Sequence, residues 1–299
     1  MGRLLPEESV THHHLMASTA QHAYWLEEPE VKDMFLDLLD FLCRIFYVET
    51  LGFVVMGTHY HLCVKVSRPK FDLEDIRRRF ELAQSRMAYP RKFQEAAAEG
   101  LYKRYTDLSK FMWYLNRIFA GKYNKLKGTK GRFWSSPYKN IVVEDGKALL
   151  AVLSYIELNP VRAGMVEDPA SFEHSSVGRI AKAIQKGETP EAPGIESLKQ
   201  LPEKIRALTY LDWISYVALT VKDQSLQRET LPKQFTDKGW MIDMGAIYEA
   251  LATKAPENWS TLVYGSGKYK KEILEAAGWL IPIGGLREAP PSGDSKAAA

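Results

Sequence analysis

The sequence contains little cysteine and no long apolar run. Its 299 residues include only two cysteines, Cys43 and Cys63, which lie inside apolar stretches rather than in a CxxC pair. This distribution argues against a disulfide framework and a cysteine–zinc site, so we expect both thiols to be small buried groups. No segment approaches the roughly 20 apolar residues of a membrane helix, and the amino-terminal residues lack a signal peptide's apolar stretch. We therefore expect a cytoplasmic protein without a membrane partner.

A strong overall charge is also missing, because the formal net charge at pH 7 is only +3. Basic residues are nevertheless concentrated in residues 101–140, where Asp107 is the only acid. Aromatic side chains interleave with them, so the segment offers rings that can stack on unpaired bases and cations that neutralise phosphates. The alternative is a solvated basic helix face whose aromatic residues lie in the core. The candidate DNA contacts in this segment are Arg117, Lys122, Lys125, Lys127, Lys130, Arg132, Trp134, Tyr138 and Lys139.

Hydrophobic periodicity alternates along the chain between the spacing of strands and that of helices. It predicts strands over residues 12–19, 48–57, 59–67 and 139–144, and helices over residues 31–46, 73–99, 108–126 and 145–159. The four predicted strands and the helical segments between them follow the order β-α-β-β-α-β, which is that of a ferredoxin-like split βαβ sheet. We therefore predict an α+β fold, in which an antiparallel sheet carries helices on its faces and one further helix behind it.

Two histidines mark the third predicted strand. His59 and His61 are two residues apart, so the period of a strand places both imidazoles on one face and Tyr60 on the other. Imidazoles that project from a rigid sheet can hold a divalent ion. Two alternatives remain: a half-buried pair satisfied by nearby backbone, and a zinc hydrolase site. The second is disfavoured because no third histidine or glutamate is well placed nearby.

The last predicted helix of this region carries a tyrosine on its flank. Its apolar residues gather on one side, whereas Tyr155 and Asn159 are four residues apart and therefore stacked beside that side. A tyrosine hydroxyl, with an ordinary pKa near 10, attacks a phosphodiester only if a cation polarises the phosphate. Asn159 is a candidate third metal ligand. The alternative is a tyrosine that packs at the helix edge with its hydroxyl in water.

These motifs occur together and in a particular order. An HxH strand, the basic segment GRFWSSPYKNIVVED and the run SYIELNPVRAGMVEDPASFEHSS resemble the REP-associated tyrosine transposases of the HUH single-tyrosine superfamily, over about residues 12–178. The resemblance implies the HUH endonuclease fold. It also implies that Tyr155 is the nucleophile and that His59, His61 and Asn159 hold Mg²⁺ or Mn²⁺. We add Arg162 of the second run to the candidate DNA contacts.

The resemblance further implies a reaction and a substrate. Tyr155 attacks single-stranded DNA at repetitive extragenic palindromic (REP) hairpins that carry a short flanking recognition sequence, and a 5′-phosphotyrosine forms that a 3′-hydroxyl can later reseal. The protein would then be nucleoid-associated and either a monomer or a homodimer. The alternative is a host-adopted protein that binds DNA hairpins without transposition. The chain departs from the family pattern at Thr58, at Glu157 and in the motif of residues 174–177.

Three weaker signals are given minor roles. Consecutive histidines at positions 12–14 point to alternate faces of a strand, so at most two of them could serve one ion. The segment 265–268 resembles a phosphate loop but lacks its first glycine, because position 262 is leucine. Glu157 turns away from the flank that carries Tyr155, so we expect a solvated or structural carboxylate.

The sequence also suggests how the chain is divided. We predict a catalytic domain over residues 1–184, a linker over residues 185–194 that is rich in Gly and Pro, a helical carboxy-terminal extension over residues 195–286, and a disordered tail over residues 287–299. Lys268, Lys270 and Lys271 open the last predicted helix of the extension, where a bound phosphate would relieve their repulsion with the helix dipole. The extension is therefore a candidate for DNA binding.

Overall fold

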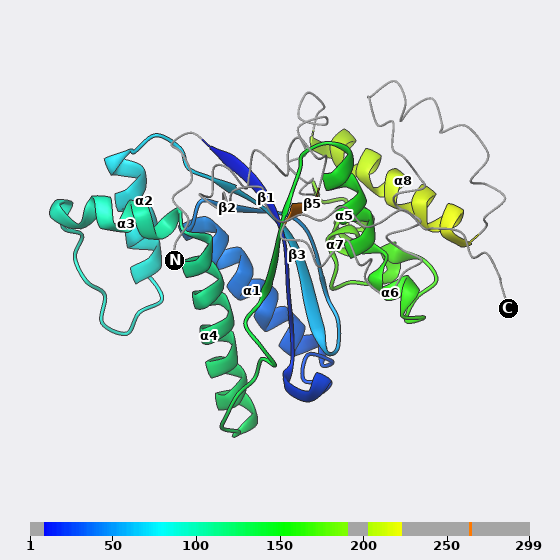
Figure 1. Cartoon of the computed structure of the whole chain (residues 1–299), viewed down its shortest axis with the longest axis horizontal. Helices are drawn as coiled ribbons and strands as arrows, with labels where there is room; N and C mark the ends of the chain where they lie inside the picture. Colours follow the sequence, from blue (N-terminus) through cyan, green and yellow to red (C-terminus); the bar gives the residue numbers. More distant parts are fainter. Residues whose placement is uncertain (1–8, 191–202, 223–262, 265–299) are drawn as a thin grey trace, which may run out of the picture.

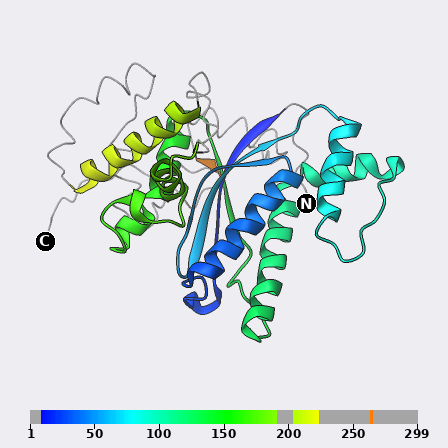
Figure 2. The same ribbon diagram turned by 180° about the vertical axis from the view of Figure 1, so that it is seen from behind.

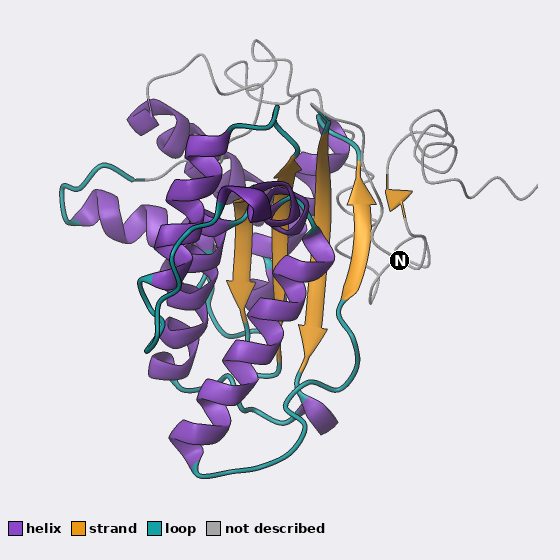
Figure 3. Ribbon diagram, turned by 90° about the vertical axis from the view of Figure 1, so that its left-hand side faces the viewer, coloured by secondary structure: helices purple, strands orange, loops and turns teal. Residues whose placement is uncertain are grey.

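An antiparallel sheet forms the centre of the computed structural model, which describes residues 9–190, 203–222 and 263–264 (Figure 1). Strand β1 (Val10–Ser18) pairs antiparallel with both β3 (His59–Ser67) and β4 (Lys139–Val143), and β2 (Val48–Val55) pairs with the other edge of β3. The two residues of β5 (Val263–Tyr264) extend the sheet beside β4, in parallel (Figure 3). The resulting order, β2-β3-β1-β4-β5, confirms the predicted α+β fold.

One face of the sheet is covered by two long helices, α1 (Pro29–Ile45) and α4 (Leu108–Lys127), which lie side by side (Figure 2). Helices α2 (Leu73–Gln84) and α3 (Ala98–Tyr105) continue this layer beyond the end of α1. Asp107 begins α4, because its side chain accepts hydrogen bonds from the backbone of Ser109 and Lys110. Gly128 ends the helix in a left-handed conformation, with φ 64°.

The opposite face is covered by α5 (Lys147–Glu157), α6 (Asn159–Arg162), α7 (Ser176–Gln185) and α8 (Glu203–Lys222), as Figure 1 shows. Short 3-10 helices occur at Ala20–His22, Glu95–Ala97 and Pro169–Ser171. Helix α8 shares one hydrophobic core with α5 and α7, to which it contributes the buried rings of Tyr210 and Trp213. The two faces of the sheet therefore have separate cores.

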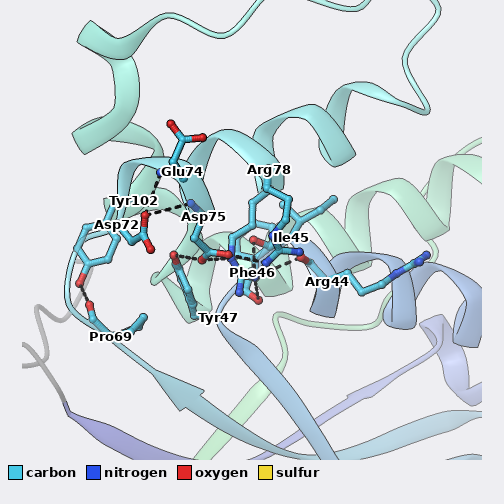
Figure 4. Close-up of polar contacts among 11 residues, drawn as sticks. Arg44, Ile45, Phe46, Tyr47, Pro69, Asp72, Glu74, Asp75, Arg78 and Tyr102 are labelled. Atoms are coloured by element: carbon cyan, nitrogen blue, oxygen red, sulfur yellow. Dashed lines mark hydrogen bonds and ion pairs between the residues drawn. The ribbon is translucent and has the colours of Figure 1, made fainter.

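An arginine of α2 closes the end of α1. The Nε atom of Arg79 donates a hydrogen bond to the carboxylate of Asp75 at 2.8 Å, and the hydroxyl of Tyr47 donates to the same carboxylate at 2.7 Å. Burial alone would raise the pKa of Asp75, but hydrogen bonds from Arg79, Tyr47 and Arg78 outweigh it and lower the pKa to about 2. Arg79 also donates to three backbone carbonyls that the helix end leaves without helical partners. They belong to Arg44, Ile45 and Phe46, which are labelled in Figure 4.

Two predicted boundaries differ from the observed ones. The single helix predicted over residues 73–99 is divided into α2 and α3, with a loop between them that contains Pro90. Proline lacks the backbone N–H of a helix interior and disfavours helical geometry in the residue before it, so the division has a local cause. The helix predicted over residues 145–159 ends earlier, at Glu157, and Asn159 begins α6.

Other predictions are tested only in part. Cys63 is buried as expected, whereas Cys43 is half-buried beside Thr50. None of the helices that the structure describes combines the length and apolar character needed to cross a membrane. The predicted linker begins where α7 ends. Most of the predicted extension, including Lys268, Lys270, Lys271 and the segment 265–268, lies outside the described residues, as does the predicted tail over residues 287–299.

Candidate active site

The two histidines of the HxH motif project from β3 toward α5. Their ring centres are 5.1 Å apart, His61 is buried and His59 is half-buried. Tyr60 points to the opposite face, where its ring lies 4.7 Å from that of Phe35 and its hydroxyl donates to Asn116 at 2.8 Å. The alternation predicted from the sequence is therefore observed in the strand.

Tyr155 meets His61 from near the carboxy-terminal end of α5, the helix that crosses the same face. The Tyr155 ring lies edge-on to His61, with ring centres 5.6 Å apart and an interplanar angle of 89°. The residue is only 7% exposed, so its ring is packed rather than free at the helix edge. The structure thus brings together a strand motif and a helix residue that are 94 positions apart, as their numbers in the chain show.

A third histidine, from β1, completes the group. The Nε2 atom of His14 lies 3.0 Å from Nδ1 of His61, and the two rings stack with centres 5.1 Å apart. The sequence analysis gave the histidines at positions 12–14 a minor role. The signal that could have identified His14 is strand pairing, because β1 lies directly beside β3 and its even-numbered residues share the face of His59 and His61.

Burial keeps these imidazoles neutral. It lowers the pKa of His14 to about 3. Burial is also the largest cause that lowers the pKa of His61 well below its ordinary value, followed by the charges of His14, His59 and Arg162. The pKa of His59 is lowered by burial and then by His22. A neutral imidazole is the form that binds a metal ion, so the site is already in the protonation state that a cation requires.

Asn159 occupies the junction between α5 and α6. Its amide nitrogen donates to the backbone carbonyl of Tyr155 at 2.8 Å and to that of Ile156 at 3.4 Å, so the side chain closes the end of the tyrosine helix. Its oxygen is the atom of this side chain that could serve as a metal ligand. Within residues 9–190, 203–222 and 263–264, no three His, Cys, Asp or Glu side chains are grouped to hold one ion. A cation here would need amide, water or phosphate oxygens beside the two imidazoles.

Arg162 adds a positive charge next to the tyrosine. Its guanidinium carbon lies 5.0 Å from the centre of the Tyr155 ring, and the side chain is exposed to solvent. The same charge contributes to the low pKa of His61. An arginine in this position can both attract a phosphate and stabilise negative charge that develops beside the tyrosine.

Glu157 follows the tyrosine by two residues but serves the helix rather than the site. Its buried carboxylate accepts hydrogen bonds from the Ser176 hydroxyl, from the Val177 backbone at 3.2 Å and from the Tyr210 hydroxyl at 3.0 Å. Burial raises its pKa to about 7, although these hydrogen bonds oppose the rise. The expectation of a structural carboxylate is therefore confirmed.

The motif at residues 174–177 has a structural role as well. Ser175 begins α7 by accepting a hydrogen bond from the backbone of Gly178 at 3.0 Å, and Ser176 accepts one from the backbone of Phe53 at 2.8 Å. His174 pairs with Asp33 at 3.2 Å. The serines thus connect α7 to β2 and, through Glu157, to the tyrosine helix.

The candidate DNA contacts divide into exposed cations and packed aromatics. Trp134 is only 8% exposed; its ring lies among Tyr60, Phe119 and Phe133, and its Nε1 donates to the Asn116 carbonyl at 3.0 Å. This placement favours a core role for Trp134 over base stacking. Tyr138 is half-buried, whereas Lys127 forms an ion pair with Glu28 at 2.6 Å. The exposed cations are Arg117, Lys122, Lys125, Lys127, Lys130, Arg132, Lys139 and Arg162.

One aromatic residue of the basic segment is available at the surface. Trp113 on α4 is 50% exposed, and the guanidinium of Arg117 lies 5.1 Å from its ring centre. Trp113 lies in the basic segment but is not among the contacts predicted from the sequence. Exposure, which the sequence does not state, distinguishes it from Trp134.

Comparison with known proteins gives little independent guidance. No protein-family model matches the chain, and no curated protein matches its sequence. Among solved structures it is similar to one described as a REP-associated tyrosine transposase bound to a REP hairpin, with a TM-score of 0.38 and 14% identity. The likeness covers 64% of this chain and 89% of that chain. A likeness this weak carries no functional argument, so function must be argued from the site.

Proposed function

We propose that the chain is a metal-dependent single-stranded DNA endonuclease and transposase that nicks and rejoins DNA at palindromic hairpins through a 5′-phosphotyrosine. The observation that carries the proposal is the edge-on contact between Tyr155 and His61, at 5.6 Å, with Arg162 on the same tyrosine ring at 5.0 Å. The proposed nucleophile Tyr155 therefore has a proposed metal ligand, His61, and the positive guanidinium of Arg162 beside its ring. The family resemblance in the sequence supports the same reaction.

In the proposed reaction the phenolic oxygen of Tyr155 forms a bond to phosphorus while the bond from phosphorus to the 3′ oxygen breaks. The phenolic proton is lost, and the departing 3′ oxygen takes up a proton to become a hydroxyl. Arg162 neutralises the charge that accumulates on the phosphate oxygens. Because one phosphodiester replaces another, the 3′-hydroxyl of a second strand can attack the phosphotyrosine and restore the backbone.

The proposed metal ligands are His59, His61 and the amide oxygen of Asn159. A divalent ion bound there would polarise a non-bridging phosphate oxygen and make phosphorus more electrophilic. The two neutral imidazoles are softer ligands than Mg²⁺ prefers. Of the two ions that we propose, Mg²⁺ and Mn²⁺, we therefore expect Mn²⁺ to support the faster cleavage.

The proposed substrate is a single-stranded hairpin of the REP type with a short flanking sequence. The exposed cations between Arg117 and Lys139 support a contact with its phosphates. A fully paired duplex should be a poor substrate, because the scissile phosphodiester must reach a tyrosine on a fixed helix.

A covalent-adduct assay tests the proposal. The full chain is incubated with labelled single-stranded hairpin oligonucleotides and Mn²⁺ or Mg²⁺, and the products are separated on a denaturing gel. Tyr155→Phe removes the attacking oxygen and leaves the ring, so the adduct should disappear while hairpin binding persists. Tyr47→Phe is the matched control, because it removes a hydroxyl that donates to Asp75 on the opposite face of the sheet.

The same assay distinguishes the alternative function. Wild-type protein that binds the hairpin but forms no adduct with either ion would be a hairpin-binding protein without transposition. An adduct that persists in Tyr155→Phe would instead show that another residue is the nucleophile.

A further inference from the structure

His14 and His61 form a direct contact that the proposed reaction does not use. The Nε2 atom of His14 and the Nδ1 atom of His61 are 3.0 Å apart, a normal hydrogen-bond distance. His14 is fully buried and His61 is 5% exposed. Water therefore has little access to compete for either nitrogen, and the contact is expected to be persistent.

Strand register explains why the two rings meet. In the antiparallel pair of β1 and β3, Met16 lies opposite His61 and Cys63 lies opposite His14. His14 and His61 are thus diagonal neighbours on one face of the sheet, within reach of long side chains. The ring of Tyr155 lies 6.0 Å from that of His14 and 5.6 Å from that of His61, so it packs over this pair.

The direction of the hydrogen bond determines which atom His61 can offer to a cation. A neutral imidazole carries one N–H and one lone pair, on different nitrogens. If His14 accepts, His61 is protonated on Nδ1 and its Nε2 lone pair is free for a ligand. If His14 donates, the proton of His61 is on Nε2 and that atom cannot bind a metal. Metal-binding histidines usually donate their second N–H to a carboxylate or carbonyl.

We infer that His14 is a positioning residue, whose Nε2 accepts the Nδ1 proton of His61 and so holds His61 in the tautomer that presents Nε2 to a divalent cation. This inference rests on the proposed function for the identity of the cation site, but the tautomer of His61 can be measured without activity. His14 touches neither the phosphate nor the cation. In this proposal it acts through its hydrogen bond to His61.

The test uses the full chain labelled with ¹⁵N-histidine. Long-range proton–nitrogen NMR spectra report which ring nitrogen carries the proton, and wild-type His61 is expected to carry it on Nδ1. His14→Phe removes the acceptor and retains a ring, so both tautomers of His61 should be populated. Mn²⁺ affinity, measured by titration calorimetry, should then fall roughly ten- to hundredfold. His14→Gln offers an amide oxygen as acceptor and should restore part of both effects.

His13→Phe provides the control. His13 is buried in the same strand but faces the other side, where Thr11 lies 2.8 Å and Asn140 3.0 Å from its ring nitrogens. Its replacement also removes buried hydrogen bonds and should leave the His61 tautomer and the Mn²⁺ affinity as in wild type.

The outcomes separate this inference from the proposed function. A wild-type His61 that carries its proton on Nε2 would overturn the inference even if every variant fails to fold. So would a tautomer that is unchanged in His14→Phe, or an equal loss of Mn²⁺ affinity in His13→Phe. By contrast, absence of any adduct in wild type would overturn the proposed function alone, because the tautomer would still be measured.

Discussion

The two faces of the sheet are built from different kinds of side chain. The face under α1 and α4 is filled by large rings and aliphatic groups, among which Phe119 packs edge to face against both Phe35 and Phe133. The face under α5 and α8 buries the titratable side chains of His14, His61 and Glu157 within its apolar core, whereas the first face buries a histidine, His13, beside Thr11 and Asn140. Buried polar groups cost free energy unless they are paired, whereas buried rings stabilise the fold directly. One face therefore serves stability, and the other accepts a cost in stability at the position where chemistry is proposed.

A single strand supplies both faces. In β3, Tyr60 and Leu62 point toward α1 and α4, whereas His59, His61 and Cys63 point toward α5. We therefore expect substitutions on the face under α1 and α4 to change the free energy of unfolding without changing the cleavage reaction. Substitutions on the second face should change chemistry, pH dependence or the coupling between helices.

The largest expected effect is the loss of cleavage in His61→Ala. Removal of this imidazole opens the proposed metal shell and leaves the phosphate unpolarised, so adduct formation should be abolished, and EDTA should have the same effect on wild type. Gel assays with the hairpin oligonucleotide measure both. His174→Ala is the control, since that half-buried histidine pairs with Asp33 away from Tyr155. Full activity of His61→Ala in chelator would favour a metal-free tyrosine chemistry.

Phe119→Ala should have the largest effect on stability. The side chain is fully buried, and its ring centre lies 5.2 Å from that of Phe35 and 5.3 Å from that of Phe133. We expect the free energy of unfolding in urea to fall by about 3–5 kcal/mol, while the protein that remains folded still forms adduct. Leu153→Ala, on the tyrosine helix, should lower both stability and adduct formation. Equal loss of adduct in both variants would contradict the division between faces.

Glu157→Gln should change how stability depends on pH. Burial raises the folded pKa of Glu157 to about 7, above the ordinary value of 4.5, so the folded state favours the protonated acid. The stability that the protonated Glu157 side chain contributes to the folded state is fully present below pH 4.5 and is lost as the pH rises through 7. The unfolding free energy of wild type relative to Glu157→Gln should therefore fall by something on the order of 3 kcal/mol between pH 4.5 and pH 8. If the unfolding free energies of wild type and Glu157→Gln, measured in urea, change with pH in the same way, the burial of this carboxyl is contradicted.

The smallest expected effect is that of Trp213→Phe. Its indole nitrogen donates to the Ser154 hydroxyl at 3.1 Å, which joins α8 to the residue before Tyr155. Loss of this hydrogen bond should lower the unfolding free energy by about 1 kcal/mol. Tyr210→Phe removes a second bond between the same helices, to Glu157, and is the matched comparison. If both variants are as stable as wild type, α8 does not depend on these contacts.

Much of the fold could be predicted from the sequence because its causes are local. The period of two in β3, the aspartate before α4 and the glycine after it act through neighbouring residues. The prediction failed between Gln84 and Ala98, where the periodic signal continued across a loop and Pro90 was given too little weight. Within the candidate site, the pairing of His59 with His61 followed from alternation alone.

The contacts that define the site were decided by tertiary structure. Three of these contacts join residues that are distant in sequence: the hydrogen bond between His14 and His61, the one between Tyr210 and Glu157, and the ring contact that buries Trp134 against Tyr60. They depend on which strand lies beside β3 and on which helix covers each face, and a periodic pattern specifies neither. The sequence by itself determined which side of each element is apolar and which residues could carry chemistry. Only the folded sheet decided which of those residues meet, because strand register and helix packing set the distances between them.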